Sequence, residues 1–192
     1  MKVKVVNLQS ELSLEVAENS FFVLVPNKNI KNSALSFVIV CDEVSCKVVY
    51  ADILHDRNFA LDLEIIPRGS NTKTDVIVRT VLENNGVFDF KGNLRLNRGV
   101  QNSKGRLDVK GLSSGENIGW ISRPLLEVAE KDTEAVHKSG LINFNQDQLI
   151  YLGSRGLGQD EAREALRKSF LSEVVNIIPD AKVREEYTRL YE

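Results

Sequence analysis

The chain has 192 residues, of which 42% are hydrophobic and 27% are charged, and its formal net charge is −2. A chain of this size and composition can bury a core without disulfides, and its charge balance argues against a protein that mainly grips polyanions. No apolar run approaches the ~20 residues that a membrane-spanning helix needs, and the first residues show no export signal, so we expect a cytoplasmic protein without a membrane partner.

From Phe21 to about Val136 the sequence is a series of short β-type runs, among them FFVLV, LSFVIV, LDLEII and DVIVRTVL. Val, Ile, Leu and Phe dominate these runs, and segments rich in Asn, Gly, Ser and Asp separate them. The runs begin roughly every 11 to 15 residues, which favours successive strands without intervening helices. A two-sheet sandwich and a parallel β-helix both fit this spacing, and Asn85-Gly86 alone gives a two-residue hairpin signal.

The last quarter of the chain predicts three helices. Asn145 can cap the segment QDQLIYL, with Gln148 completing a capping box. The second helix begins after Gly158 with acidic residues in its first turn, where the helix dipole favours them. Its apolar stripe consists of Ala162, Ala165, Leu166, Phe170, Val174 and Ile178. Pro179 ends this helix and Asp180 caps the last one, so we predict a β core over 1–143 and a helical tail over 144–192.

Three glycines in the stretch YLGSRGLGQDEA, between residues 151 and 162, raise the question of a phosphate-binding loop. The common NTPase loop needs G-x-x-x-x-G-K-[ST] between a strand and a helix. Here no Lys-Ser or Lys-Thr pair follows, and the preceding segment has a helical pattern. Glycine after one helix and before the next is ordinary turn chemistry, so we interpret this stretch as a helix–helix corner.

The run LIYLGSRGLGQDEAREALRKSFLSEVV nevertheless resembles the C-terminal signature of the SufB/SufD family of iron–sulfur cluster assembly proteins. The upstream segments PLLEVAEKDTEAVHKSGLINFNQDQLIYL and FKGNLRLNRGVQNSKGRL are similar to the family pattern too, so the resemblance covers about Phe88 to Val175. It implies a mainly β fold, a right-handed parallel β-helix (solenoid) with a small C-terminal helical region. It also implies that the tail docks onto SufC, an ABC-type ATPase, and that two β-helix subunits pair with a nascent cluster at their junction.

The sequence departs from the family at two positions that matter for cluster chemistry. SufB-type chains have His-Glu and SufD-type chains have His-Gly where this chain has His137-Lys138. SufB also has a cysteine upstream of that histidine, whereas the corresponding stretch RLDVKGLSSG contains no thiol. Because thiolates are the preferred ligands of iron–sulfur clusters, the resemblance is closer to SufD, the non-catalytic partner subunit.

The candidate site residues follow from this resemblance and from side-chain chemistry. His137 is a candidate metal ligand at the subunit junction, with a surface or hydrogen-bonded histidine as the alternative. An arginine that can bind a carboxylate and large aromatic side chains are typical partner contacts. We therefore predict partner binding by Tyr151, Arg155, Gly156, Phe170, Tyr187 and Tyr191. The expected partners are a SufC-like ABC-type ATPase and either a second copy or a longer SufB-like subunit, and any cofactor beyond a transient cluster, flavin included, is left open.

Other functions have weaker signals. Cys41 and Cys46 would need two further ligands for a zinc site, and a buried cysteine usually acts as a small hydrophobe. Acidic residues interrupt the basic residues between Lys91 and Arg123, and few aromatic side chains lie among them to stack on bases. We therefore expect no nucleic-acid partner. No nucleophile motif or triad is evident, which predicts a protein that is not an enzyme. Two alternatives remain: a solenoid interaction module unrelated to cluster assembly, and a small carbohydrate-active β-helix enzyme with paired carboxylates.

Overall fold

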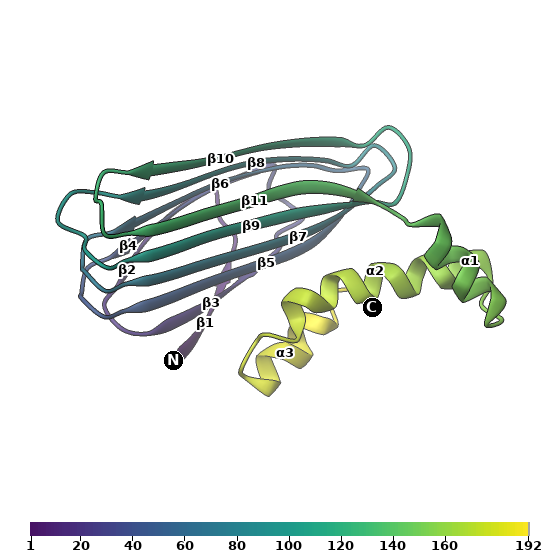
Figure 1. Cartoon of the computed structure of the whole chain (residues 1–192). Helices are drawn as coiled ribbons and strands as arrows, with labels where there is room; N and C mark the ends of the chain where they lie inside the picture. Colours follow the sequence, from purple (N-terminus) through teal and green to yellow (C-terminus); the bar gives the residue numbers. More distant parts are fainter. Residues whose placement is uncertain (192) are drawn as a thin grey trace.

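The computed structural model describes residues 1–191, and within that range it contains eleven strands followed by three helices (Figure 1). The strands are β1 (Lys2–Asn7), β2 (Glu11–Val16), β3 (Ser20–Val25), β4 (Asn32–Ile39), β5 (Ser45–His55), β6 (Asn58–Pro67), β7 (Lys73–Glu83), β8 (Val87–Leu96), β9 (Lys104–Ser113), β10 (Gly119–Val128) and β11 (Glu134–Asn143). The helices are α1 (Gln146–Ser154), α2 (Gln159–Val175) and α3 (Ala181–Thr188). Strands therefore give way to helices between Asn143 and Gln146.

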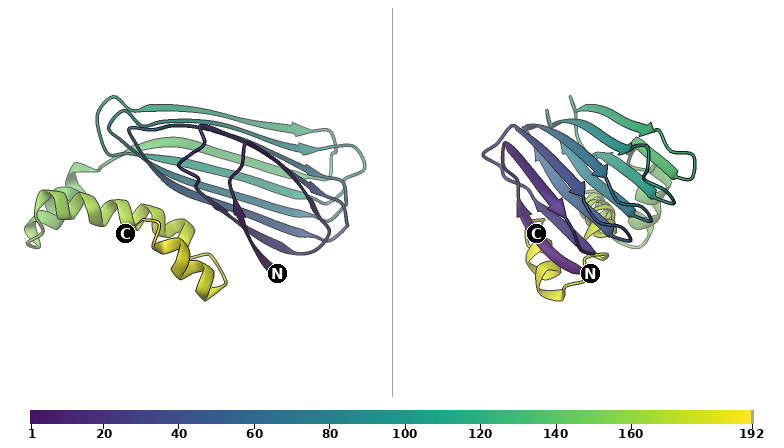
Figure 2. Two further views of the ribbon diagram at one scale, coloured as in Figure 1. Left: turned by 180° about the vertical axis from the view of Figure 1, so that it is seen from behind. Right: turned by 90° about the vertical axis from the view of Figure 1, so that its left-hand side faces the viewer.

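The strands form two sheets that the chain visits alternately. The odd-numbered strands make a six-stranded sheet in the order β1-β3-β5-β7-β9-β11, and the even-numbered strands make a five-stranded sheet in the order β10-β8-β6-β4-β2. Every neighbouring pair is parallel. The fold is thus a parallel β-solenoid, which confirms the fold that the resemblance implies and excludes the hairpin-built sandwich (Figure 2).

The corners between the sheets require a backbone conformation that most residues avoid. One non-glycine residue with positive φ occurs in each of six corners: Glu43, Asp56, Asn71, Asn85, Asn102 and Asn117. Asn and Asp tolerate this left-handed region better than most other residues, which explains the Asn- and Asp-rich spacers of the sequence. Asn85-Gly86 is such a corner, because it joins β7 and β8 of different sheets and forms no hairpin.

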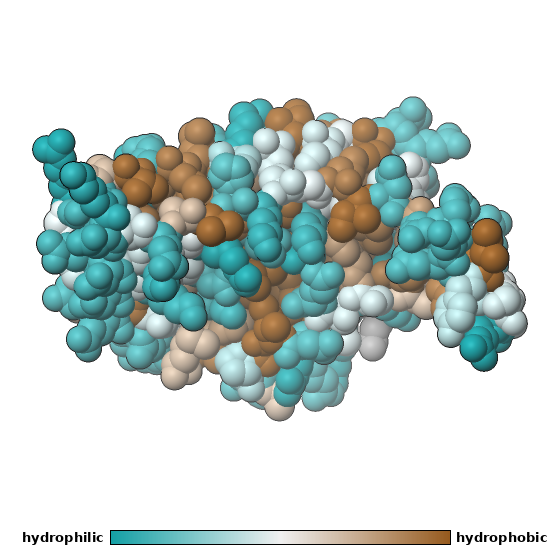
Figure 3. Space-filling model, viewed as in Figure 1, coloured by the Kyte–Doolittle hydropathy of each residue, from teal (hydrophilic) through white to brown (hydrophobic). Residues whose placement is uncertain are grey.

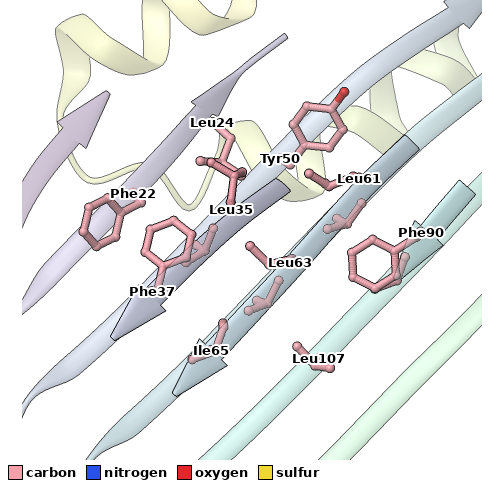
Figure 4. Packing of buried hydrophobic residues seen from close by; sticks show 14 of the residues in the cluster. Phe22, Leu24, Leu35, Phe37, Tyr50, Leu61, Leu63, Ile65, Phe90 and Leu107 are labelled. Carbon is pink, nitrogen blue, oxygen red and sulfur yellow. The ribbon is translucent and has the colours of Figure 1, made fainter. Parts of the chain in front are cut away.

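The main core lies between the two sheets. In strands, alternate side chains point to opposite faces, and the inward-facing set is almost entirely Leu, Ile, Val and Phe. The rings of Phe22 and Phe37 pack edge to face across the two sheets, with centroids 4.8 Å apart. Figure 4 shows Leu61, Leu63 and Phe90 continuing this packing from rung to rung. Stacking of equivalent residues therefore makes the solenoid a continuous apolar column.

A second core lies between the helices and the outer face of the odd-numbered sheet. Helix α2 crosses β5 and β7, as Figures 1 and 2 show, and buries Phe170 and Val174 against Val49 and Ile77. The predicted N-cap residues Asn145 and Asp180 accept backbone N–H bonds of 2.9 Å each, but among the described residues Asn145 forms no capping box with Gln148. Among residues 1–191, no helix combines the length and apolar character needed to cross a membrane.

Candidate functional site

The solenoid ends at β10 and β11, which occupy the last position of their sheets. Each strand therefore has a single neighbour, and the backbone groups along its other edge have no strand partner. Their register with β8 and β9 shows which side chains face inward. These are Trp120, Ser122, Pro124, Leu126, Val128, Ala135, His137, Ser139 and Leu141, which we call the terminal rung.

The terminal rung continues the apolar column but has no further rung to cover it. Phe88, Phe90 and Leu107, the equivalents in the preceding rung, are buried, whereas Leu141 is 39% exposed. The hydroxyl of Ser139 donates to that of Ser122 at 2.6 Å and so links the two strands. Val128 of the terminal rung is exposed too, and further exposed apolar residues occur elsewhere on the same strands: Ile121, Leu125, Val136 and Ile142. Figure 3 shows hydrophobic side chains on this upper side of the molecule.

His137 lies on β11 within this surface and is exposed. No group of three His, Cys, Asp or Glu side chains suited to a metal ion occurs in the described part of the chain. Cys46 is in the interior core on β5, where burial raises the pKa of its thiol to about 12, and Cys41 lies in the loop after β4. Because β7 and β9 separate β5 from β11, the donors of one chain do not form a site for an iron–sulfur cluster.

The corner between α1 and α2 forms a second exposed surface. Helix α1 has no buried residue, and Ile150 and Tyr151 are 69% and 57% exposed. The guanidinium of Arg155 lies over the Tyr151 ring, 5.3 Å from its centroid. Gly156 has φ +94°, a conformation that suits glycine at the end of a helix. Three of the six residues predicted to contact a partner, Tyr151, Arg155 and Gly156, thus lie together on this corner.

The other three lie on the opposite side of the helical segment, against the sheet. Phe170 and Tyr187 are buried. The Tyr187 hydroxyl donates to the carbonyl of Leu24 at 2.9 Å and accepts the N–H of Ala51 at 2.8 Å, while the Tyr191 hydroxyl donates to the Ala51 carbonyl at 2.7 Å. These aromatic residues attach the helices to their own sheet. Phe170 and Tyr187 are thus covered by this chain itself and Tyr191 is half-buried, and their contact with a partner stays a prediction.

Two ion pairs that the sequence did not reveal also hold α2. Arg79 on β7 is 3% exposed and contacts Glu173 of α2, and Glu83 at the end of β7 pairs with Arg167. Charged residues in a strand usually face solvent, so composition gave no reason to expect them here. The sequence did contain one indication of this burial. Arg79 lies within the run DVIVRTVL, and such a nearly continuous apolar run is typical of a strand that is covered on both faces.

Several known proteins are similar to this chain in sequence. The family model described as "SUF system FeS cluster assembly, SufBD core domain" matches residues 17–170. The chain is 28% identical over 120 residues to "Protein ABCI7, chloroplastic" of Arabidopsis thaliana, covering 62% of this chain and 25% of that protein. It is 24% identical over 164 residues to an iron-sulfur cluster assembly SufBD family protein of Methanothermobacter thermautotrophicus, covering 84% of this chain and 39% of that protein.

A third relative, an iron-sulfur cluster assembly SufBD family protein of Mycobacterium leprae, is 26% identical over 114 residues. That alignment covers 57% of this chain and 13% of the relative. The chain therefore spans between 13% and 39% of the length of these three curated relatives.

Proposed function

The chain belongs to the SufBD family of the SUF system for iron–sulfur cluster assembly, and from this premise we propose that it is a non-catalytic scaffold subunit. In this role the solenoid pairs through its terminal rung, and the α1–α2 corner receives a SufC-like ABC-type ATPase. The observation that supports the proposal most is the pair of open edges at β10 and β11, lined by exposed apolar side chains. The cytoplasmic location expected from the sequence remains a prediction.

Pairing at the terminal rung has two physical driving forces. Unpaired strand edges offer backbone donors and acceptors to another strand, and covering Leu141 and its neighbours removes apolar surface from water. The edges differ, since Pro124 supplies no N–H donor along β10. Strand β11 contains no proline and so offers the more complete edge. The proposed partner is a second copy of this chain or a longer SufB-like subunit.

The cluster is a cargo of the assembled pair in this proposal. His137 lies on the pairing surface, but one chain supplies no thiolate there. The remaining ligands would have to come from the other subunit, and we derive no chemical step from this chain alone. The contribution of this subunit is a rigid platform with one imidazole at the junction.

The ATPase contact is proposed for the exposed side of the helical segment. Ile150, Tyr151 and Arg155 are of the residue types that frequently anchor protein interfaces, and all three are exposed in the described part of the chain. Helix α2 is attached to the odd-numbered sheet by the contacts of Arg79 and Phe170. A force that the ATPase applies to the corner would therefore reach the solenoid and its terminal rung through a packed element.

The carbohydrate-enzyme alternative gains no support. A groove of about 270 Å³ on the outer face of the even-numbered sheet contains Asp62 and Glu64. These carboxylates pair with Lys91 at 2.9 Å and with Arg95 at 3.0 Å, whereas glycoside hydrolysis needs two carboxyl groups available to the substrate.

Sedimentation of purified protein tests the pairing. The Leu141→Lys variant places an ammonium group in the terminal rung. We expect the affinity of the chain for a second copy or for a SufB-like subunit to fall at least about tenfold, because a buried unpaired charge is costly. Leu190→Lys is the matched control, since Leu190 is 46% exposed and lies outside this surface. Equal association of the two variants would contradict the proposed pairing surface.

A further inference from the structure

The opposite end of the solenoid is built differently from the terminal rung. Strands β1 and β2 are the last strands there, and each has six residues, against ten in β10 and in β11. Lys2 and Lys4 lie in register with Ser20 and Phe22 of β3. Because Ser20 and Phe22 face the interior, the two lysines project to the inward side of an edge strand, where apolar residues would otherwise continue the column.

Glu18, in the corner before β3, holds both lysines at this edge. Its carboxylate is 3.2 Å from the Lys2 ammonium and 3.6 Å from that of Lys4. The Lys4 ammonium also lies 5.4 Å from the centroid of the Phe22 ring, which gives it a cation–π contact. The hydrogen bond from Lys2 lowers the pKa of the Glu18 carboxyl group below its ordinary value. The cluster of three charges therefore sits over the end of the apolar column.

We propose that Lys2, Lys4 and Glu18 close the first strand against strand addition, so that copies of this chain join only through their terminal rungs. The inference rests on the proposed pairing for its functional meaning, because it explains why such an assembly would stop at two. Another strand placed along β1 would have to strip water from both ammonium groups, and inward-pointing charges of this kind are a known protection of sheet edges. The terminal rung contains no lysine, arginine, aspartate or glutamate.

The direct test removes the charges and keeps the strand. The double variant Lys2→Val and Lys4→Val should associate beyond the wild type, with a weight-average mass at least about twofold higher at equal concentration, because an uncharged apolar edge invites pairing. Lys28→Val and Lys31→Val form the matched control, since both lysines are exposed and lie in the loop between β3 and β4. If the double variant at β1 sediments like the wild type, the inference is overturned. The same holds if the Lys28 and Lys31 control associates as strongly as the double variant.

Adding Leu141→Lys to the β1 variant separates this inference from the proposed function. If the triple variant still associates more than the wild type, the additional contact must form along β1, whether or not the terminal rung pairs. If the variants fold poorly, hydrogen exchange of the wild-type protein tests the closure of β1 without any substitution. We expect the backbone amides of β1 to exchange at the same rate at low and high protein concentration, and concentration-dependent protection of β1 would refute the closure.

Discussion

Arg79 of β7 and Glu173 of α2 form a partly buried ion pair, in which Nε donates to the carboxylate at 2.7 Å. The same guanidinium donates through Nη1 to Asp108 Oδ1 at 3.0 Å and to the Val78 carbonyl at 2.9 Å. One side chain thus ties the helical segment to two strands of the odd-numbered sheet. This contact is one of several that attach the helices to the solenoid, beside the apolar contacts of Phe170 and the hydrogen bonds of Tyr187.

The first prediction concerns this contact. Arg79→Met should lower the free energy of unfolding by about 3–5 kcal/mol, because it leaves the Asp108 carboxylate buried without its partner. Glu173→Gln should cost about 1 kcal/mol or less, since this side chain is 46% exposed and solvent screens the pair. Urea unfolding followed by circular dichroism measures both values. Equal losses in the two variants would show that the buried guanidinium has no special role.

The Tyr187 hydroxyl supplies the second prediction. It binds the N–H of Ala51 at the point where the pairing of β3 with β5 ends at Leu24 and Tyr50. Tyr187→Phe leaves that buried N–H without a partner and should cost about 1–3 kcal/mol. Tyr151→Phe serves as the control, because the Tyr151 side chain is exposed and should tolerate the change. Thermal unfolding compares the two, and an unchanged melting temperature for Tyr187→Phe would argue against the hydrogen bond.

The two thiols should differ in reactivity. The thiolate is the reactive species, and burial raises the pKa of Cys46 to about 12, so this residue is almost entirely protonated at pH 8. Cys41 is exposed. We expect iodoacetamide to label Cys41 alone in the folded protein and both residues in denaturant, as read by peptide mass spectrometry. Rapid labelling of Cys46 in the folded state would contradict its position in the core.

Asp52 predicts a specific pH dependence of stability. Its carboxylate is buried on β5 and accepts a hydrogen bond of 2.7 Å from Tyr50, while Arg57 forms an ion pair with it. Burial is the dominant cause that raises the pKa of Asp52 in the folded state. Between the ordinary aspartate pKa and this raised value, the folded protein binds more protons than the unfolded chain, so the Asp52 contribution to stability falls as the pH rises.

The Asp52→Asn variant isolates this contribution. As the pH falls from neutral towards the ordinary aspartate pKa, the unfolding free energy of the wild type should improve relative to that of Asp52→Asn. Urea unfolding of both proteins at several pH values gives the difference. A difference that stays constant with pH would mean that Asp52 titrates alike in the folded and unfolded states.

Local patterns predicted the elements well, because both strands and helices obey short-range rules. Apolar alternation located the strands, and Asn145, Gly158 and Asp180 marked the starts of the helices. The topology needed the family resemblance, since Asn85-Gly86 suits a hairpin and a solenoid corner equally: both require a residue with positive φ. Strand β1 lies within the predicted β core over 1–143 but before the first recognised β-type run at Phe21, because its lysines break the apolar pattern at an edge.

The sites were harder to predict, because exposure depends on which surfaces pack together. Tyr151 and Tyr187 both lie in short helices, yet α3 packs on the sheet and α1 does not. A clue was present in α2, whose apolar stripe of Ala162, Phe170 and Val174 recurs at helical spacing and marks a buried face. Helix α1 has Leu149, Ile150, Tyr151 and Leu152 in succession, without such a stripe.

The role of the α1–α2 corner is the central claim, and a binding measurement with a purified SufC-like ABC-type ATPase tests it most directly. Deleting the whole tail would uncover the second core, so a point variant is the sharper probe. We expect the wild type to bind the ATPase in titration calorimetry and Ile150→Asp to lose at least about tenfold in affinity, as for an interface anchor. Leu190→Asp should bind like the wild type. Undetectable binding by the wild type, or equal affinity of Ile150→Asp and the wild type, would contradict the account.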